Sequence, residues 1–177
     1  MIKKLDVLVL ILLPMIAVLG SLFFRANFLV STLLFFGLHS LYLSWRTPKA
    51  IVRTLVFTLI ATPFTVFIFD LLGHLTKIWW VETIFPFRLL GVIPIEDVLW
   101  GFLYIYSLVI FYEHFLDKGK NNLIDKRMKH FVAMGLVGMS FVLVGLFSGF
   151  ILLTFPTPYS SFGLIFLLIP VALFLTH

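Results

Sequence analysis

The chain has 177 residues, of which 62% are hydrophobic and only 12% are charged, and its mean hydropathy is +1.15. Soluble globular domains carry about 25% charged residues, so this composition excludes an ordinary soluble domain and indicates a membrane protein. The sequence contains no cysteine, which excludes disulfide bonds, thiolate catalysis and cysteine-ligated metal sites.

Six apolar runs divide the chain, and each is close to the length of about 20 residues that a transmembrane helix needs. The first begins after Lys3 and Lys4; it is too long for a signal peptide and has no clear cleavage site. Only short connections remain, so the predicted fold is all-α, a polytopic transmembrane helical bundle of residues 1–177 as one domain. The expected spans are 5–24, 28–45, 50–72, 95–115, 130–155 and 159–176.

The distribution of Lys and Arg predicts the orientation of these spans, because cytoplasmic loops carry an excess of positive residues. With the N-terminus inside, three of the 13 basic residues, Arg25, Lys77 and Arg88, lie outside, and the other ten lie in the cytoplasm. We therefore expect a multi-pass protein of the cell membrane with both termini cytoplasmic. The excess of Lys and Arg on the predicted cytoplasmic side accounts for the net charge of +5, so nucleic acid is not an expected partner.

Ionisable residues gather at the opposite, non-cytoplasmic end of the predicted bundle. They come from the end of the third span, the following connection and the start of the fourth span. Ionisable groups within a membrane are candidates for function, so this convergence is the main functional indication in the sequence. The residues concerned are Asp70, His74, Glu82, Glu96 and Asp97.

The segment Pro94-Ile95-Glu96-Asp97 opens the fourth span. One interpretation is a stable helix start, since proline fits the first helical position and each acid in the first turn gains roughly 0.3–1 kcal/mol from the helix dipole. The other is a pair of partly desolvated acids within one turn of Trp100 and Tyr104. Desolvation favours the neutral, proton-donating form of a carboxyl group. The pattern alone leaves both interpretations open.

The connection between the third and fourth spans, residues 73–93, has mixed character. It is too apolar for a solvated loop, and Pro86 and Gly91 interrupt it too often for a span. We expect an interfacial or re-entrant element. Its Trp79 and Trp80 either anchor the membrane interface, where tryptophan is enriched, or present aromatic faces to a substrate.

The order of motifs in this region resembles the small membrane-embedded lycopene cyclase domain family. The resemblance covers about Phe69 to Phe115, and it departs from the family where Trp100-Gly101 replaces the usual aromatic pair after the acids. Complete enzymes of this type contain two homologous three-helix units, whereas this chain has one acid motif, so the resemblance implies a second homologous subunit or a homodimer. The residues that carry the resemblance are Asp70, Trp79-Trp80, Gly91, Pro94-Ile95-Glu96-Asp97 and Leu99-Trp100.

The resemblance implies a lyase or isomerase that cyclises the end group of a linear, hydrophobic polyene taken from the lipid bilayer. Protonation of the terminal double bond gives a carbocation, ring closure moves it, and loss of a proton completes a reaction without net redox. No cofactor and no metal are expected, and the sequence has no Gly-rich dinucleotide fingerprint. The implied catalytic residues are Glu96, Asp97 and Asp70, the substrate-binding residues are Trp79, Trp80, Trp100 and Tyr104, and the structural motif is Gly91 and Pro94.

Three alternatives share the same sequence features. A carotenoid hydratase would let water capture the same cation. A proton- or cation-coupled transporter would use the acids as an ion site. A non-catalytic membrane partner subunit would need only close helix packing, for which Gly145-x-x-x-Gly149 is suited.

Overall fold

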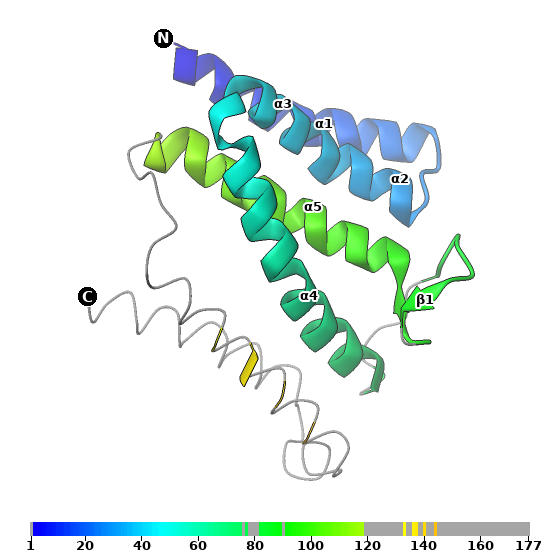
Figure 1. Cartoon of the computed structure of the whole chain (residues 1–177). Coiled ribbons are helices and arrows are strands. Elements are labelled where there is room, and N and C mark those ends of the chain that lie inside the picture. Colours follow the sequence, from blue (N-terminus) through cyan, green and yellow to red (C-terminus); the bar gives the residue numbers. More distant parts are fainter. Residues whose placement is uncertain are drawn as a thin grey trace. The chain divides into compact units, whose positions relative to one another are not determined.

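The computed structural model of the protein describes most of the N-terminal part of the chain (Figure 1). The chain divides into two compact units, and the division falls within one long helix, after Pro63. The first unit comprises Met1–Pro63 and Glu82–Lys126, and the second comprises Phe64–Val81 and Arg127–His177. The described residues are 2–75, 77, 82–89, 91–118, 133, 136, 137, 140 and 144.

Helices form most of the described backbone. A single helical run combines α2, the π-helical turn η1 and α3, and a short 3-10 turn, η2, leads from this run into α4. A second π-helical turn, η3, extends α5. The bounds are α1 Ile2–Phe23, α2 Phe28–Thr32, η1 Leu33–Gly37, α3 Leu38–Arg46, η2 Pro48–Ala50, α4 Ile51–Leu75, α5 Ile95–Tyr112 and η3 Glu113–Asp117.

Within the described residues, four helical segments are long and apolar enough to cross a membrane. They overlap the first four predicted spans, so the expectation of a mainly helical chain with apolar helices is confirmed for this part. The spans expected at 130–155 and 159–176 fall almost entirely outside the described residues. The four segments are Lys4–Phe23, Phe28–Arg46, Pro48–Val66 and Ile95–Asp117.

Local chemistry fixes the turns that join these helices. Arg25 adopts a left-handed conformation (φ 47°) in the turn after α1, and the side chain of Asn27 caps α2 by accepting a hydrogen bond from the Val30 N–H at 2.9 Å. Lys118 is also left-handed (φ 55°), and its N–H donates to the Glu113 carbonyl at 2.9 Å, which ends η3.

The core of the first unit lies where α3 and η1 pack against α5 and α1 packs against η1. Leu43, Ala50, Tyr106 and Ile110 form a buried cluster there. The Tyr106 hydroxyl lies 2.7 Å from Oγ of Ser44, so a polar contact as well as apolar packing joins α5 to α3.

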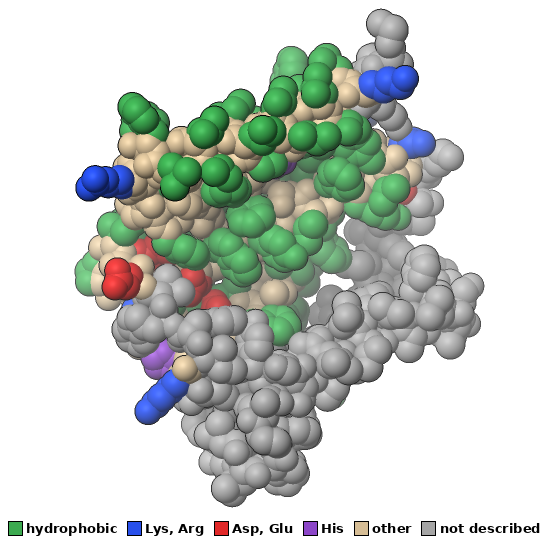
Figure 2. Space-filling model, turned by 180° about the vertical axis from the view of Figure 1, so that it is seen from behind, with side chains coloured by type: hydrophobic (Ala, Val, Ile, Leu, Met, Phe, Trp, Pro, Cys, Tyr) green, Lys and Arg blue, Asp and Glu red, His purple; other side chains and the backbone are tan. Residues whose placement is uncertain are grey.

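The outer surface is apolar. Figure 2 shows hydrophobic side chains covering the visible face of the described residues, with Lys and Arg at its ends. On α1, exposed side chains include Leu8, Ile11, Met15, Leu19 and Leu22. An apolar surface of this extent is unfavourable in water, whereas helices satisfy their own backbone hydrogen bonds and are stable in hydrocarbon. The surface is thus compatible with a place in the membrane.

Candidate functional site

The segment that precedes α5 folds into a short β-hairpin, which the sequence did not predict. β1 (Arg88–Leu89) pairs antiparallel with β2 (Ile93–Pro94), and Figure 1 shows this hairpin beside the start of α5. Gly91 takes φ +72° in the turn, and its N–H donates to the Arg88 carbonyl at 3.1 Å. Glycine adopts this left-handed conformation without the steric cost that other residues incur, so a glycine suits this position in the turn.

Pro94 lies at the junction of the hairpin and the helix. It is extended (φ −61°, ψ 144°), pairs with Arg88 and forms the N-cap of α5. The prediction that Pro94 takes the first helical position is therefore wrong by one residue, because strand pairing holds its backbone extended. Ile95 begins the helix, and Glu96 and Asp97 lie in the first turn as expected.

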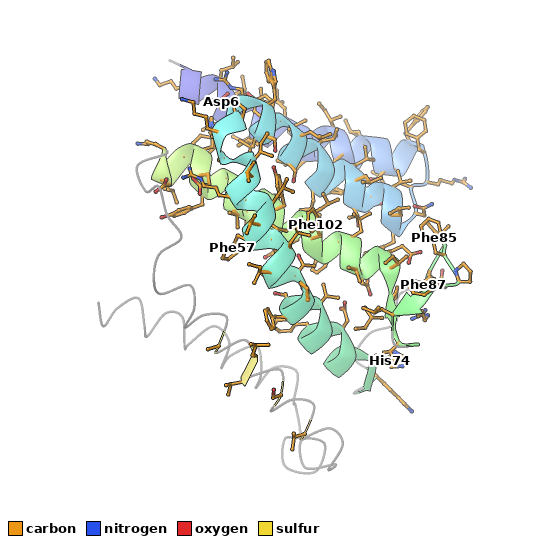
Figure 3. The ribbon with its side chains drawn as sticks, in the orientation of Figure 1. Asp6, Phe57, His74, Phe85, Phe87 and Phe102 are labelled. Atoms are coloured by element: carbon orange, nitrogen blue, oxygen red, sulfur yellow. The ribbon has the colours of Figure 1, made fainter. Side chains whose placement is uncertain are left out.

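Glu96 anchors the loop before β1, residues 82–87, to the start of α5. The residue is only 2% exposed, and its Oε1 accepts hydrogen bonds from the backbone N–H groups of Ile84, at 2.7 Å, and Phe85, at 2.8 Å. Figure 3 shows Phe85 and Phe87 on this loop. The second carboxylate oxygen, Oε2, is buried and makes no hydrogen bond to any described residue. One oxygen of Glu96 thus holds the loop, and the other is buried without a hydrogen-bond partner among the described residues.

Asp97 is the second buried acid of the pair and is 5% exposed. Its side chain projects about 100° around the helix from that of Glu96. The charge of Arg88 acts on both carboxylates, and Nη1 of Arg88 donates to the Val92 carbonyl at 3.0 Å. Two neighbouring buried acids near the cation Arg88 can support acid–base chemistry, because the two carboxyl groups can hold different protonation states.

Three aromatic rings extend the site beside α5, two of them on that helix. Trp100 and Tyr104 stack in parallel, with ring centroids 5.4 Å apart and an interplanar angle of 1°. Phe36, from η1, meets both rings edge-on, with centroids 6.2 Å from Trp100 and 5.6 Å from Tyr104. Trp100 is 36% exposed and Tyr104 38% exposed. Aromatic faces attract cations, so this cluster can stabilise positive charge one to two turns from the acids.

Phe36 did not figure among the candidate residues. It reaches the cluster from a π-helical turn, and such turns occur frequently at functional sites. Sequence gives little warning of a π-helical turn; the only signal here is the run of aromatic and small residues Phe35-Phe36-Gly37 inside the second span.

The other predicted site residues lie elsewhere. Asp70 is buried on α4 in the second unit, and α4 continues through His74, four residues later. Both residues are engaged in interactions within the protein. Their convergence with the acids of the first unit stays a prediction. Trp79 and Trp80 lie outside the described residues, so their role also stays a prediction.

A second polar cluster, which the sequence reasoning missed, surrounds Asp6 of α1 (Figure 3). Asp6 is fully buried. Its Oδ1 accepts hydrogen bonds from the Tyr42 hydroxyl at 2.6 Å and from Nε of Arg46 at 2.8 Å, and its Oδ2 lies 3.0 Å from Nε2 of His114. The signal that could have identified it is an acid one turn inside an apolar span, since such a charge requires a partner.

This cluster extends over the cytoplasmic end predicted for the bundle. Nδ1 of His114 lies 2.6 Å from Oγ1 of Thr47. Arg53 of α4 pairs with Glu113, and its Nη2 lies 3.6 Å from Oδ2 of Asp117. About 18 residues of helix separate this cluster from Glu96, which is roughly 27 Å at a rise of 1.5 Å per residue. The described part of the chain therefore has a polar cluster at each end of the α5–η3 helix.

The acid pair can transfer protons. The aromatic cluster beside it can stabilise a cation. The described residues contain no group of three His, Asp or Glu side chains that could hold a metal ion. No protein-family model, no curated protein and no solved structure matches this chain.

Proposed function

We propose that the protein is a membrane-embedded cyclase of carotenoid end groups, acting on a linear substrate of the lycopene type. A carboxyl group of the acid pair protonates the terminal C=C bond, the resulting carbocation is attacked by a second C=C bond of the same chain to close the ring, and a carboxylate removes a proton from the cyclic cation. One proton enters and one leaves, so the reaction is an isomerisation without net redox.

One observation carries this proposal: Glu96 is buried at the start of α5 with Oε2 unpaired among the described residues, and the stacked pair Trp100–Tyr104 follows on the same helix. The reaction needs a proton donor next to a surface that tolerates a carbocation without offering water to it. The apolar exterior of the first unit suits delivery of a polyene from the bilayer.

The resemblance of the sequence to the lycopene cyclase domain family adds to this proposal. It also motivates the wider arrangement that we propose: six spans, both termini in the cytoplasm, and Asp70, Trp79 and Trp80 close to the acid pair. Because the acid motif occurs once in the chain, we propose that the active form contains a second copy or a homologous subunit.

Expression in cells that accumulate lycopene tests the proposal. We expect extracted pigment to contain carotenoids of unchanged mass with cyclic end groups, from the chain alone if it forms a homodimer or with a homologous subunit if it does not. A product heavier by one water would indicate hydration of the same cation. Unchanged lycopene in both cases, with the protein present in the membrane, would contradict the proposal.

Glu96→Gln provides the decisive variant. Glu82→Gln is its matched control, because Glu82, unlike the buried acid pair, is exposed and has no role in the proposed reaction. An amide cannot donate or accept the catalytic proton, and such groups typically contribute about 10²–10⁴-fold to a rate. We expect Glu96→Gln to abolish conversion at normal protein levels and Glu82→Gln to convert as the unmodified chain does.

A further inference from the structure

An open cavity of about 360 Å³ lies in the first unit, beside the aromatic cluster. Its walls come from α1, η1, α3 and α5, and include Leu10, Phe35, Phe36, His39, Ser107 and Phe111. The volume is within the range of about 300–1,000 Å³ typical of small-molecule sites. Phe36 also contacts the stacked rings of Trp100 and Tyr104, so the cavity adjoins the aromatic cluster.

The polar side chains in the cavity wall lie within hydrogen-bonding distance of backbone carbonyl oxygens. Nδ1 of His39 lies 2.5 Å from the Phe35 carbonyl oxygen, and Nε2 lies 3.3 Å from the carbonyl oxygen of Leu10. The Ser107 hydroxyl donates to the Tyr104 carbonyl at 2.8 Å. An occupant would therefore find aliphatic and aromatic surface and little to bind a polar group.

The cavity opens on the outer surface of the first unit. Leu108 and Phe111 contribute to its lining and are 52% and 44% exposed. In a helix that crosses a bilayer, exposed apolar residues of this kind contact hydrocarbon, so the opening faces lipid tails. Because lipid tails are as apolar as leucine, occupancy depends on van der Waals packing and shape, with no hydrophobic driving force. A flexible chain that fits between the aromatic rings satisfies that condition.

From the volume, the mainly apolar lining and the lateral opening, we propose that this cavity binds one long hydrocarbon tail that enters from the bilayer. Two sources have this chemistry, an acyl chain of a phospholipid and an isoprenoid chain. The site is distinct from the acid pair, and its occupancy does not require the proposed cyclisation.

Photolabelling of the full-length protein in lipid nanodiscs tests this inference. One sample contains phosphatidylcholine with a diazirine at the end of an acyl chain, and the other contains an isoprenoid alcohol with a diazirine on its chain. Mass spectrometry then locates the adducts. We expect adducts on Phe36 and Ser107 to exceed those on Leu19 and Leu22 of α1 severalfold, although these two leucines are the more exposed to lipid.

Two variants fill the cavity, Leu10→Phe and Ser107→Phe, and either should reduce labelling of Phe36 severalfold. Leu41→Phe is the matched control, because Leu41 is on α3 and 70% exposed; it should leave labelling unchanged. The use of two filling variants keeps the test valid if one of them fails to fold.

The two probes identify the source. Preferential labelling by the acyl probe assigns a phospholipid, by the isoprenoid probe an isoprenoid, and both outcomes support a hydrocarbon site. Adducts spread evenly over the exposed helix faces, or labelling that persists in both folded filling variants, would overturn it. Glu96→Gln should label like the unmodified protein, so failure of the cyclase proposal and failure of this one can be told apart.

Discussion

Nε2 of His114 lies 3.0 Å from Oδ2 of Asp6, although 108 positions separate the two residues in the sequence. The contact joins the first helix of the chain to the end of the α5–η3 helix. A carboxylate can only accept hydrogen bonds, so Nε2 carries the hydrogen and Nδ1 faces the hydroxyl of Thr47. Together with Tyr42 and Arg46, this arrangement satisfies a charge that would otherwise be buried without a partner.

Replacement of Asp6 should therefore destabilise the protein. Asp6→Asn removes the buried negative charge with which Arg46 and His114 interact. We expect a lower unfolding temperature in detergent and lower membrane levels. Glu82→Gln, the same type of change at an exposed position, should leave both unchanged. Equal stability of the two variants would show that the Asp6 cluster contributes little.

A comparison of two replacements separates the structural role of Glu96 from a catalytic one. The glutamine of Glu96→Gln still offers an oxygen to the N–H groups of Ile84 and Phe85, whereas Glu96→Ala leaves both without an acceptor, at about 1–3 kcal/mol each. We expect both variants to lose conversion of the carotenoid, but only Glu96→Ala to make the loop sensitive to limited proteolysis. Full conversion by Glu96→Gln would leave the residue with the anchoring role alone.

Asp97 has no comparable role in holding the loop, since the hydrogen bonds to Ile84 and Phe85 are made by Glu96. We expect Asp97→Asn to reduce conversion about 10²-fold or more, as for a general acid–base residue, with the proteolysis pattern of the unmodified protein. A variant that converts normally would remove Asp97 from the proposed mechanism.

The aromatic cluster makes a smaller, graded prediction. A cation–π contact contributes about 0.5–2 kcal/mol, so Trp100→Ala should slow conversion roughly 2- to 30-fold and Trp100→Phe less. Trp45→Ala is the control, because Trp45 is exposed on α3. The same two changes at Trp79 and Trp80 distinguish membrane anchoring, which lowers protein levels, from contact with the substrate, which lowers the rate at constant levels.

Gly91→Ala should loosen the hairpin. The left-handed conformation costs a residue with a Cβ about 1–2 kcal/mol, and nothing lies within 4 Å of the added atom, so backbone strain is the whole effect. Hydrogen exchange of the Ile84 and Phe85 amides should become faster. Gly20→Ala is the control, because its Cβ would make an ordinary contact of 3.7 Å with Leu34. Identical exchange in both variants would mean that the turn does not support the loop.

The absence of cysteine allows a direct test of orientation. Arg25→Cys and Lys77→Cys should react with a maleimide that cannot cross the membrane, added to intact cells. Lys49→Cys and Lys118→Cys should react only after the cells are opened. Labelling of all four from the same side would contradict the orientation that the positive residues predict.

The sequence by itself determined where the described helices lie. Four runs of apolar residues indicated them, because a segment in hydrocarbon must satisfy its own backbone hydrogen bonds and needs a fixed length to cross. It also placed Glu96 and Asp97 in the first turn of α5 and Trp100 within one turn of Tyr104, since helical periodicity makes residues four apart neighbours. These features depend only on local spacing and composition.

The tertiary structure alone decided which groups meet. The partners of Asp6 on α3 are 36 and 40 positions away, and the donors to Glu96 are backbone N–H groups, which every residue except proline carries and no sequence pattern distinguishes. Phe36 meets Trp100 because η1 packs against α5. Such contacts depend on how helices pack and where the chain turns back, so their geometry comes from the folded chain and not from the order of its residues.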